Sequence, residues 1–126
     1  MLNKLKKHHI GIIVGDKQID LLEKKYKGSF HLDKTQGTRV MFVSDDELGM
    51  YREYIVKEGR AKNLPLGFAH FCYCLSDNHA LEDFKKKIKD DKLGYPVTKL
   101  EKSGSPECSL IQFFFIKNHG LVEINV

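Results

Sequence analysis

Residues 8–26, "HHIGIIVGDKQIDLLEKKY", are repeated later in the chain as residues 69–88, "AHFCYCLSDNHALEDFKKKI". When the two stretches are aligned, His9 falls on His70, 61 residues further on. Each stretch begins with the apolar alternation of a β-strand and continues with the three- and four-residue spacing of a helix. An internal repeat of this kind predicts a chain built from two similar modules.

The second part of each repeat predicts a helix that covers one face of a sheet. Asp16 and Asp77 occupy matching positions where each helix should begin, and an aspartate there can accept hydrogen bonds from the free amides of the first turn. We therefore predict that both aspartates are N-caps. Apolar residues then recur on one helical face in both copies, namely Ile19, Leu22 and Tyr26 in the first and Leu81, Phe84 and Ile88 in the second.

The segments after the two helices also match each other. Residues 29–56 and 95–126 each contain three strand-like runs, separated by turn sequences rich in Gly, Asp, Asn and Ser. Each half is therefore predicted to be β-α-β-β-β, and the protein to be α+β with a largely antiparallel, curved sheet. The predicted single domain, 1–126, comprises a first module at about 5–57, a connector at 58–66 and a second module at about 67–126.

The last strand of each half carries one carboxylate within an otherwise strand-like run. Glu53 lies in "YREYIV" and Glu123 in "LVEINV", 70 residues apart. Val122 and Ile124 form an apolar side, so Glu123 projects from the opposite face of its strand. An ionised carboxylate among apolar groups costs several kcal/mol unless a cation or hydrogen-bond donors compensate it.

The same alternation places His9 and His70 on the face away from the helices. The repeat thus predicts two imidazoles and two carboxylates, His9, Glu53, His70 and Glu123, on one face of the sheet. Such a set suits a divalent ion of intermediate softness, with open positions for water or a substrate oxygen. Any one of these residues alone is more typical of a structural histidine or a solvated glutamate. Their recurrence in matching places favours a joint metal site, in which Glu53 has the least apolar surroundings.

The remaining histidines and cysteines fit this site less well. His8 and His31 have no counterpart in the other half, His79 lies in the first turn of a helix, and His119 lies in a turn. Cys72 and Cys74 lack the second thiol pair of a zinc–thiolate centre. We predict surface or turn positions for these four histidines and a place on the cavity floor for the two cysteines.

Composition excludes several classes of protein. With 126 residues, 41% of them hydrophobic, the chain suits one compact domain. It contains neither an apolar run of the roughly 18 residues that a membrane helix needs nor a secretory signal, so a cytoplasmic location is expected. The net charge of +4 comes from lysines interleaved with acids, and no nucleic-acid motif is present.

Four short segments resemble a known family. "HHIGIIV" (8–14), "REYIV" (52–56), "AHFCYCLSD" (69–77) and "HGLVEINV" (119–126) resemble the metal-bearing strands of the vicinal oxygen chelate superfamily, which includes glyoxalase I, bleomycin-resistance proteins and extradiol dioxygenases. Within it, the chain is most similar to the branch of methylmalonyl-CoA epimerase and glyoxalase I. The resemblance covers nearly the whole chain.

The resemblance implies two βαβββ modules whose eight strands form a U-shaped sheet around one divalent metal ion, with a helix from each module on the outer face, commonly in a homodimer. The implied ion is Ni, Co, Mn, Zn or Fe, and its ligands fall on His9, Glu53, His70 and Glu123. The implied activity is that of an epimerase, isomerase or lyase that moves a proton through a metal-stabilised enediolate or enolate. The substrate would be a small 2-oxo compound or acyl thioester, with Glu123 first and Glu53 second as the proton-transferring residues.

Two other functions remain open at this point. One is a non-catalytic protein of the same fold that binds a drug or another small molecule. The other is an Fe(II) dioxygenase of the extradiol type, whose two histidines and one carboxylate would be His9, His70 and Glu123. Coordination by Glu53 distinguishes these functions, because a fourth protein ligand would crowd an oxygen-binding site.

Overall fold

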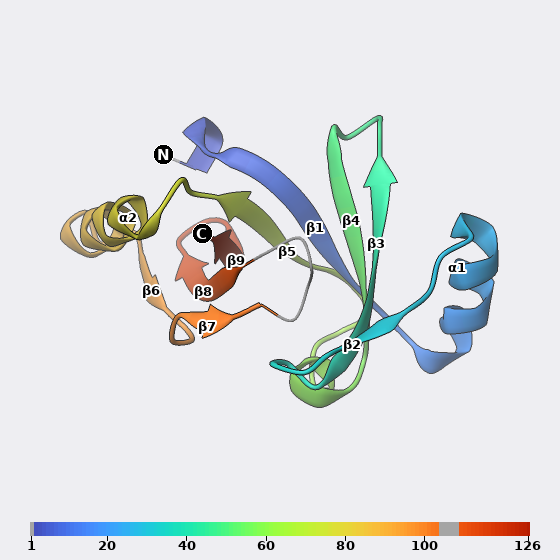
Figure 1. Cartoon of the computed structure of the whole chain (residues 1–126). Helices are drawn as coiled ribbons and strands as arrows, with labels where there is room; N and C mark the ends of the chain where they lie inside the picture. Colours follow the sequence, from blue (N-terminus) through green and yellow to red (C-terminus); the bar gives the residue numbers. More distant parts are fainter. Residues whose placement is uncertain (1, 104–108) are drawn as a thin grey trace. The chain divides into compact units, whose positions relative to one another are not determined.

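The computed structural model describes residues 2–103 and 109–126, which form two compact units. The N-terminal unit is His9–Ala69, and the C-terminal unit is His70–Val126 together with residues 2–8. Figure 1 shows their elements coloured along the chain. Neither of the helices in the described residues is long and apolar enough to cross a membrane.

The N-terminal unit contains four strands and the shorter helix. The strands run in the order β2-β3-β4-β1. Strand β1 lies parallel to β4, whereas β3 is antiparallel to both β2 and β4. The parallel pair brings the first and last strands of the module side by side. The elements are β1 (Lys6–Val14, of which His9–Val14 belong to this unit), 3-10 turn η2 (Asp16–Gln18), α1 (Ile19–Tyr26), β2 (His31–Asp33), β3 (Thr38–Asp45), β4 (Met50–Val56) and η3 (Gly59–Ala61).

The C-terminal unit repeats this arrangement with a longer helix. Its strands run in the order β5-β9-β8-β6, with β7 also paired to β8. Strand β5 is parallel to β9, and the other pairs are antiparallel. The elements are 3-10 turn η1 (Leu2–Lys4), β5 (Gly67–Cys74, from His70 on in this unit), α2 (Asn78–Asp90), β6 (Gly94–Pro96), β7 (Glu101–Lys102), β8 (Leu110–Ile116) and β9 (Gly120–Asn125).

These elements confirm the predicted α+β class and the two β-α-β-β-β modules. One detail differs, because the segment after α2 forms two short strands where one was predicted. Strand β6 pairs with the end of β8 and β7 with its beginning, so together they form one interrupted strand along β8. Strand β6 ends at Pro96, which lacks an amide proton for a continuous ladder. One of the turn sequences between the predicted strands, "KSGSP" at residues 102–106, falls largely outside the described residues.

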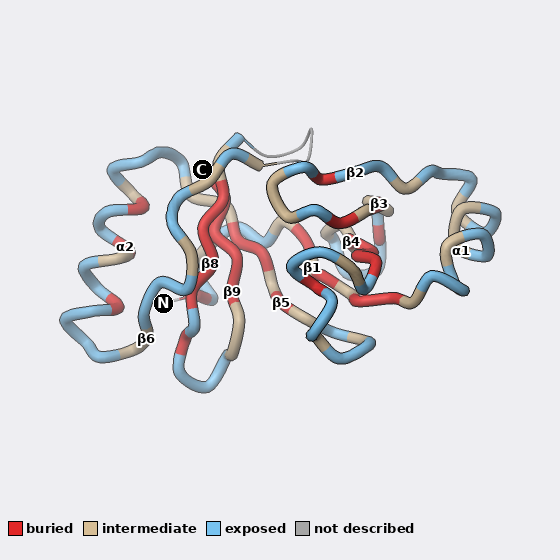
Figure 2. The backbone as a smooth tube through the Cα atoms, turned by 90° about the horizontal axis from the view of Figure 1, so that it is seen from below, coloured by how far each residue is buried: buried red, intermediate tan, exposed pale blue. Residues whose placement is uncertain are grey.

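Helix α2 supplies the main hydrophobic core of the C-terminal unit. Its predicted face is confirmed, since Leu81, Phe84 and Ile88 are 1%, 6% and 1% exposed. Phe84 meets the ring of Phe114 edge to face, with 5.2 Å between the ring centroids. Figure 2 shows the buried positions recurring along α2, and the strands β8 and β9 buried over most of their length.

The N-terminal unit has two smaller clusters, one on each face of its sheet. On the face that α1 covers, Val14, Met41 and Tyr54 are buried, and Leu22 and Tyr26 of the helix pack against them. The other face carries the second cluster, formed by Ile13, Val40, Ile55 and Ala61. This second face matters for the site, because the strand alternation of β1 and β4 also places His9 and Glu53 on it.

The two predicted N-caps have different outcomes. The Asp77 carboxylate accepts a hydrogen bond of 2.8 Å from the backbone amide of Ala80, which confirms the cap of α2. The prediction for Asp16 is wrong. Asp16 lies inside the 3-10 turn that precedes α1, no side chain caps that helix, and the Asp16 carboxylate instead accepts a bond from the Arg39 guanidinium.

Candidate metal centre

In the N-terminal unit, His9 and Glu53 form a buried pair. The Nε2 atom of His9 lies 3.2 Å from Oε1 of Glu53, and the two residues are 1% and 4% exposed. They come from the parallel strands β1 and β4, in which Gly11 is the register partner of Glu53. Because Gly11 has no side chain, nothing from β1 fills the position directly beside the carboxylate.

The C-terminal unit contains the equivalent pair. The Nε2 atom of His70 lies 3.5 Å from Oε1 of Glu123, and both residues are 3% exposed. They come from the parallel strands β5 and β9, where Cys72 is the register partner of Glu123. The two units therefore share one register. In each, the histidine lies two residues before the residue that pairs with the glutamate, so the histidine and glutamate side chains lie on the same sheet face.

Sequence reasoning missed one phenylalanine in each unit that belongs to this arrangement. Phe42 lies opposite Glu53 across the β3–β4 pair, and Phe113 lies opposite Glu123 across the β8–β9 pair. The His9 ring meets the Phe42 ring edge to face at 5.2 Å and 86°. His70 meets Phe113 in the same way at 5.3 Å and 88°. The sequence did contain a signal for them. Each glutamate follows a predicted hairpin turn, and the residue the same distance before that turn, which pairs with the glutamate across the hairpin, is Phe42 or Phe113.

A polar network lies behind Glu53, on the face that α1 covers. Arg52 donates hydrogen bonds to Asp45 and to the hydroxyl of Tyr54, at 2.6 Å and 3.1 Å. The Tyr54 hydroxyl lies 3.2 Å from that of Tyr26. The backbone amide of Leu48 and the Arg52 guanidinium hold the pKa of Asp45 below its usual value. This network explains why Arg52 and Tyr54 interrupt the apolar alternation of β4. The Arg52 guanidinium and the Tyr54 hydroxyl are hydrogen-bonded to each other on the face that α1 covers.

Two explanations account for a buried carboxylate beside an imidazole. In the first, a protonated imidazole compensates the carboxylate charge as a buried ion pair. In the second, both groups are ligands of a cation. Two atoms that bind one ion at bond lengths of about 2.0–2.2 Å and at right angles lie about 3 Å apart, and the observed separations of 3.2 and 3.5 Å approach this value. The residues present therefore fit a divalent metal ion.

Three of the four remaining histidines occupy the exposed positions predicted for them, whereas the place of the two cysteines on a cavity floor stays a prediction. His31, His79 and His119 are exposed, and His8 is half-buried. Cys72 is buried and Cys74 is partly buried, both as free thiols. Cys72 extends from β5 beside Glu123, and burial raises the pKa of the Cys74 thiol.

The four predicted ligands form two pairs, one within each unit. The single site with all four ligands stays a prediction.

Comparison by sequence identifies no relative. No protein-family model matches the chain, and no curated protein matches it significantly.

Comparison by structure gives clear matches at low sequence identity. A hypothetical protein from Bacillus halodurans C-125 matches with a TM-score of 0.69 at 14% identity, over 97% of this chain and 94% of that one. Methylmalonyl-CoA epimerase from Mycobacterium tuberculosis matches with a TM-score of 0.65 at 14% identity, over 95% and 86% of the two chains. A variant of Streptomyces coelicolor methylmalonyl-CoA epimerase in complex with 2-nitronate-propionyl-CoA matches with a TM-score of 0.58 at 16% identity, over 96% of each chain.

These matches establish the fold. The chain has the α+β fold of the methylmalonyl-CoA epimerases, so the predicted resemblance is confirmed at the level of the fold alone. At 14–16% identity, the activity of these enzymes does not transfer with the fold.

Proposed function

We propose that the protein is a divalent-metal-dependent epimerase or isomerase that moves a proton on a carbon next to a carbonyl group. The observation that carries this proposal is the recurrence of a buried His–Glu pair, with the same strand register and the same aromatic neighbour, in both units. Two such pairs form an N2O2 ligand set if both bind the same ion. His9, Glu53, His70 and Glu123 would then hold it together.

A divalent ion held by this set would supply Lewis-acid stabilisation of negative charge on a carbonyl oxygen. The chain's own groups would do the remaining work. A glutamate carboxylate oxygen can accept a proton from the adjacent carbon and return it, and we assign this role to Glu123 first and Glu53 second. The rings of Phe42 and Phe113, which pack beside the imidazoles, would limit the access of water to the histidine side of each pair.

The structural relatives suggest the substrate class. Two of them are methylmalonyl-CoA epimerases, and one was solved with 2-nitronate-propionyl-CoA. We therefore propose an acyl thioester as the first substrate to test, and the hemithioacetal of a 2-oxo aldehyde as the second. We further propose that the chain is a homodimer, which sedimentation equilibrium would test.

Metal stoichiometry tests whether the two pairs share one ion. We expect one ion per chain after dialysis against Ni²⁺, Co²⁺ or Mn²⁺, measured by inductively coupled plasma mass spectrometry. Replacing both His9 and Glu53 with alanine should then abolish binding altogether. Two ions per chain in the parent protein, or one ion retained by this double variant, would mean that each pair binds separately.

Isotope exchange tests the chemistry. Metal-loaded protein is incubated in deuterated water with methylmalonyl-CoA, and separately with the hemithioacetal of methylglyoxal. Deuterium should enter the carbon next to the carbonyl in one of them, and Glu123→Gln should slow this exchange by roughly 10²–10⁴-fold. Glu82→Gln, an exposed change on α2, serves as the control. If the metal-loaded parent protein exchanges deuterium into neither compound, the proposed reaction is refuted.

A further inference from the structure

Two aromatic rings are stacked on the surface of the C-terminal unit, away from its hydrophobic core. Tyr95 of β6 and Phe115 of β8 are register partners, and their ring centroids are 5.6 Å apart with 26° between the planes. They remain 59% and 43% exposed. Two large rings that stack on each other and stay this open to solvent present an aromatic face on which a further planar group can stack.

The backbone beneath this pair holds it in place. Gly94, which precedes Tyr95, lies so close to β8 that an added Cβ would lie 2.0 Å from the carbonyl oxygen of Phe115. Only glycine allows this approach, which brings β6 against β8 and aligns Tyr95 with Phe115. The stacked pair is thus fixed by the ladder between two strands.

A surface hollow of about 400 Å³ adjoins the rings and carries positive charge. Tyr95 and Phe115 line it together with Lys89 and Lys92, which lie at and just after the end of α2, and Lys117, which comes directly after β8. Within residues 2–103 and 109–126, no ion pair joins any of these three lysines to a carboxylate. Their charges are therefore available to an anionic ligand.

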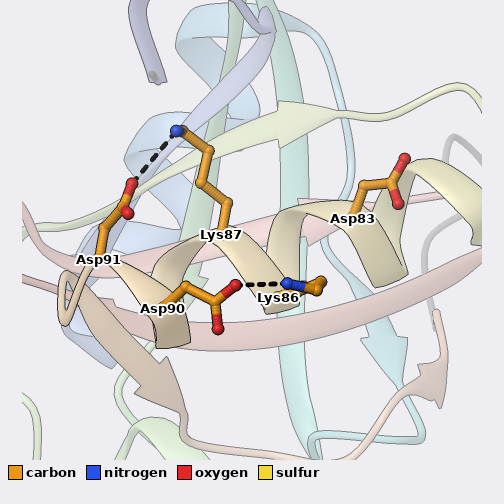
Figure 3. A pocket seen from close by; sticks show the side chains of 5 residues that line it. All are labelled: Asp83, Lys86, Lys87, Asp90 and Asp91. Carbon is orange, nitrogen blue, oxygen red and sulfur yellow. Dashed lines mark hydrogen bonds and ion pairs between the residues drawn. The ribbon is translucent and has the colours of Figure 1, made fainter.

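A neighbouring hollow on α2 provides the contrast. Figure 3 shows that Lys86 and Lys87 there point toward Asp90 and Asp91. The Lys86 and Lys87 ammonium groups are paired with these carboxylates at 2.5 Å and 3.1 Å. Both lysines of that hollow are thus held in ion pairs, and its lining residues include no aromatic ring. The combination of lysines outside ion pairs with a stacked aromatic pair distinguishes the hollow at Tyr95.

We propose that this hollow binds an adenine nucleotide, with the base stacked on the Tyr95–Phe115 pair and the phosphates beside Lys89, Lys92 and Lys117. Base stacking on aromatic side chains and attraction of phosphate to lysine are independent contributions, and a nucleotide satisfies both within one molecule. A volume of about 400 Å³ suits one nucleotide. The nucleotide is either free or the end of a larger acyl-carrier molecule.

Titration with adenosine 3′,5′-diphosphate tests the proposal, by calorimetry and by the NMR shifts of the Tyr95 and Phe115 rings. EDTA is present throughout, so the result is independent of the metal centre and of any turnover. We expect the diphosphate to bind at least about tenfold more tightly than adenosine or pyrophosphate, because each of these offers only one of the two contributions. Pyrophosphate that binds as tightly as the nucleotide would overturn the proposal.

Variants assign the binding to this hollow. Tyr95→Ala, and Lys92→Gln combined with Lys117→Gln, should each weaken diphosphate binding by about tenfold or more. The matched control, Lys86→Gln combined with Lys87→Gln, removes the same charge from the neighbouring hollow and should leave binding unchanged. An equal loss in this control would mean attraction to the overall charge of the unit and would contradict the assignment.

Two further titrations identify the source of the nucleotide. Tighter binding of acetyl-coenzyme A than of the diphosphate would support the nucleotide as the end of an acyl carrier, and equal affinities would support a free nucleotide. A single-stranded oligoadenylate that binds more tightly per site than either would overturn the mononucleotide proposal in favour of nucleic acid.

Discussion

The Nε2 atom of His9 lies 3.2 Å from Oε1 of Glu53, and both side chains are buried in the N-terminal unit. The second module reproduces this relationship at 3.5 Å between His70 and Glu123. The parallel pairing of the first and last strands in each module produces it, because that pairing brings a side chain from each end of the module together on one sheet face.

Glu53 distinguishes a four-ligand site from a three-ligand site. Replacing Glu53 with alanine removes one oxygen donor, so we expect the affinity for Co²⁺ or Ni²⁺ to fall by at least about tenfold, measured by competition with a chelating dye. Glu47→Ala, in the exposed turn before β4, is the control. Unchanged affinity in the Glu53 variant would instead favour the triad of His9, His70 and Glu123.

Phe114 and Phe115 are neighbours in β8 that point to opposite faces. Phe114 is 0% exposed in the core under α2, whereas Phe115 is 43% exposed. Phe114→Ala should lower the free energy of unfolding by about 3–5 kcal/mol, and Phe115→Ala by less than about 1 kcal/mol. Urea unfolding followed by circular dichroism measures both. Equal losses would mean that the assigned strand faces are wrong.

Asp77 and Asp16, the two aspartates predicted as N-caps, should also differ in how much each contributes to the free energy of unfolding. Asp77→Ala removes the hydrogen bond to the Ala80 amide and should lower the free energy of unfolding by about 1 kcal/mol. Asp16→Ala removes only an exposed ion pair with Arg39, which typically contributes less than about 0.5 kcal/mol. Urea titrations of the two variants provide the comparison. A larger loss of unfolding free energy for Asp16→Ala than for Asp77→Ala would instead support the N-cap role that the repeat predicted for Asp16.

Asp45 should make stability depend on pH. The Leu48 amide, followed by the Arg52 guanidinium, lowers the pKa of the folded carboxyl group. Its stabilisation is therefore fully present above the pKa of the unfolded state, about 3.9, and disappears as the pH falls through the lower folded value. We expect the unfolding free energies of the parent protein and Asp45→Asn to differ at pH 7 and to converge on acidification below about pH 4. A difference that persisted to pH 2 would contradict this.

Much of the fold could be predicted from the sequence, because the signals that define it are local. The alternation in residues 8–14 assigns His9 to one strand face, and the spacing of Leu81, Phe84 and Ile88 defines one helix face. Both patterns depend only on the geometry of a single element. Comparing the two halves then identified His70 and Glu123 as counterparts of His9 and Glu53.

Tertiary structure decided the features that depend on contact between distant segments. Strand register and close approach between elements produce three such features. They place the rings of Phe42 and Phe113 beside the imidazoles and stack Tyr95 on Phe115. They also bring the Arg39 guanidinium to the Asp16 carboxylate. The sequence alone determined which faces the histidines and glutamates occupy, since side-chain alternation is a property of one strand. The partners that each meets were decided only by folding, because register depends on turns and on pairing between strands far apart in the chain.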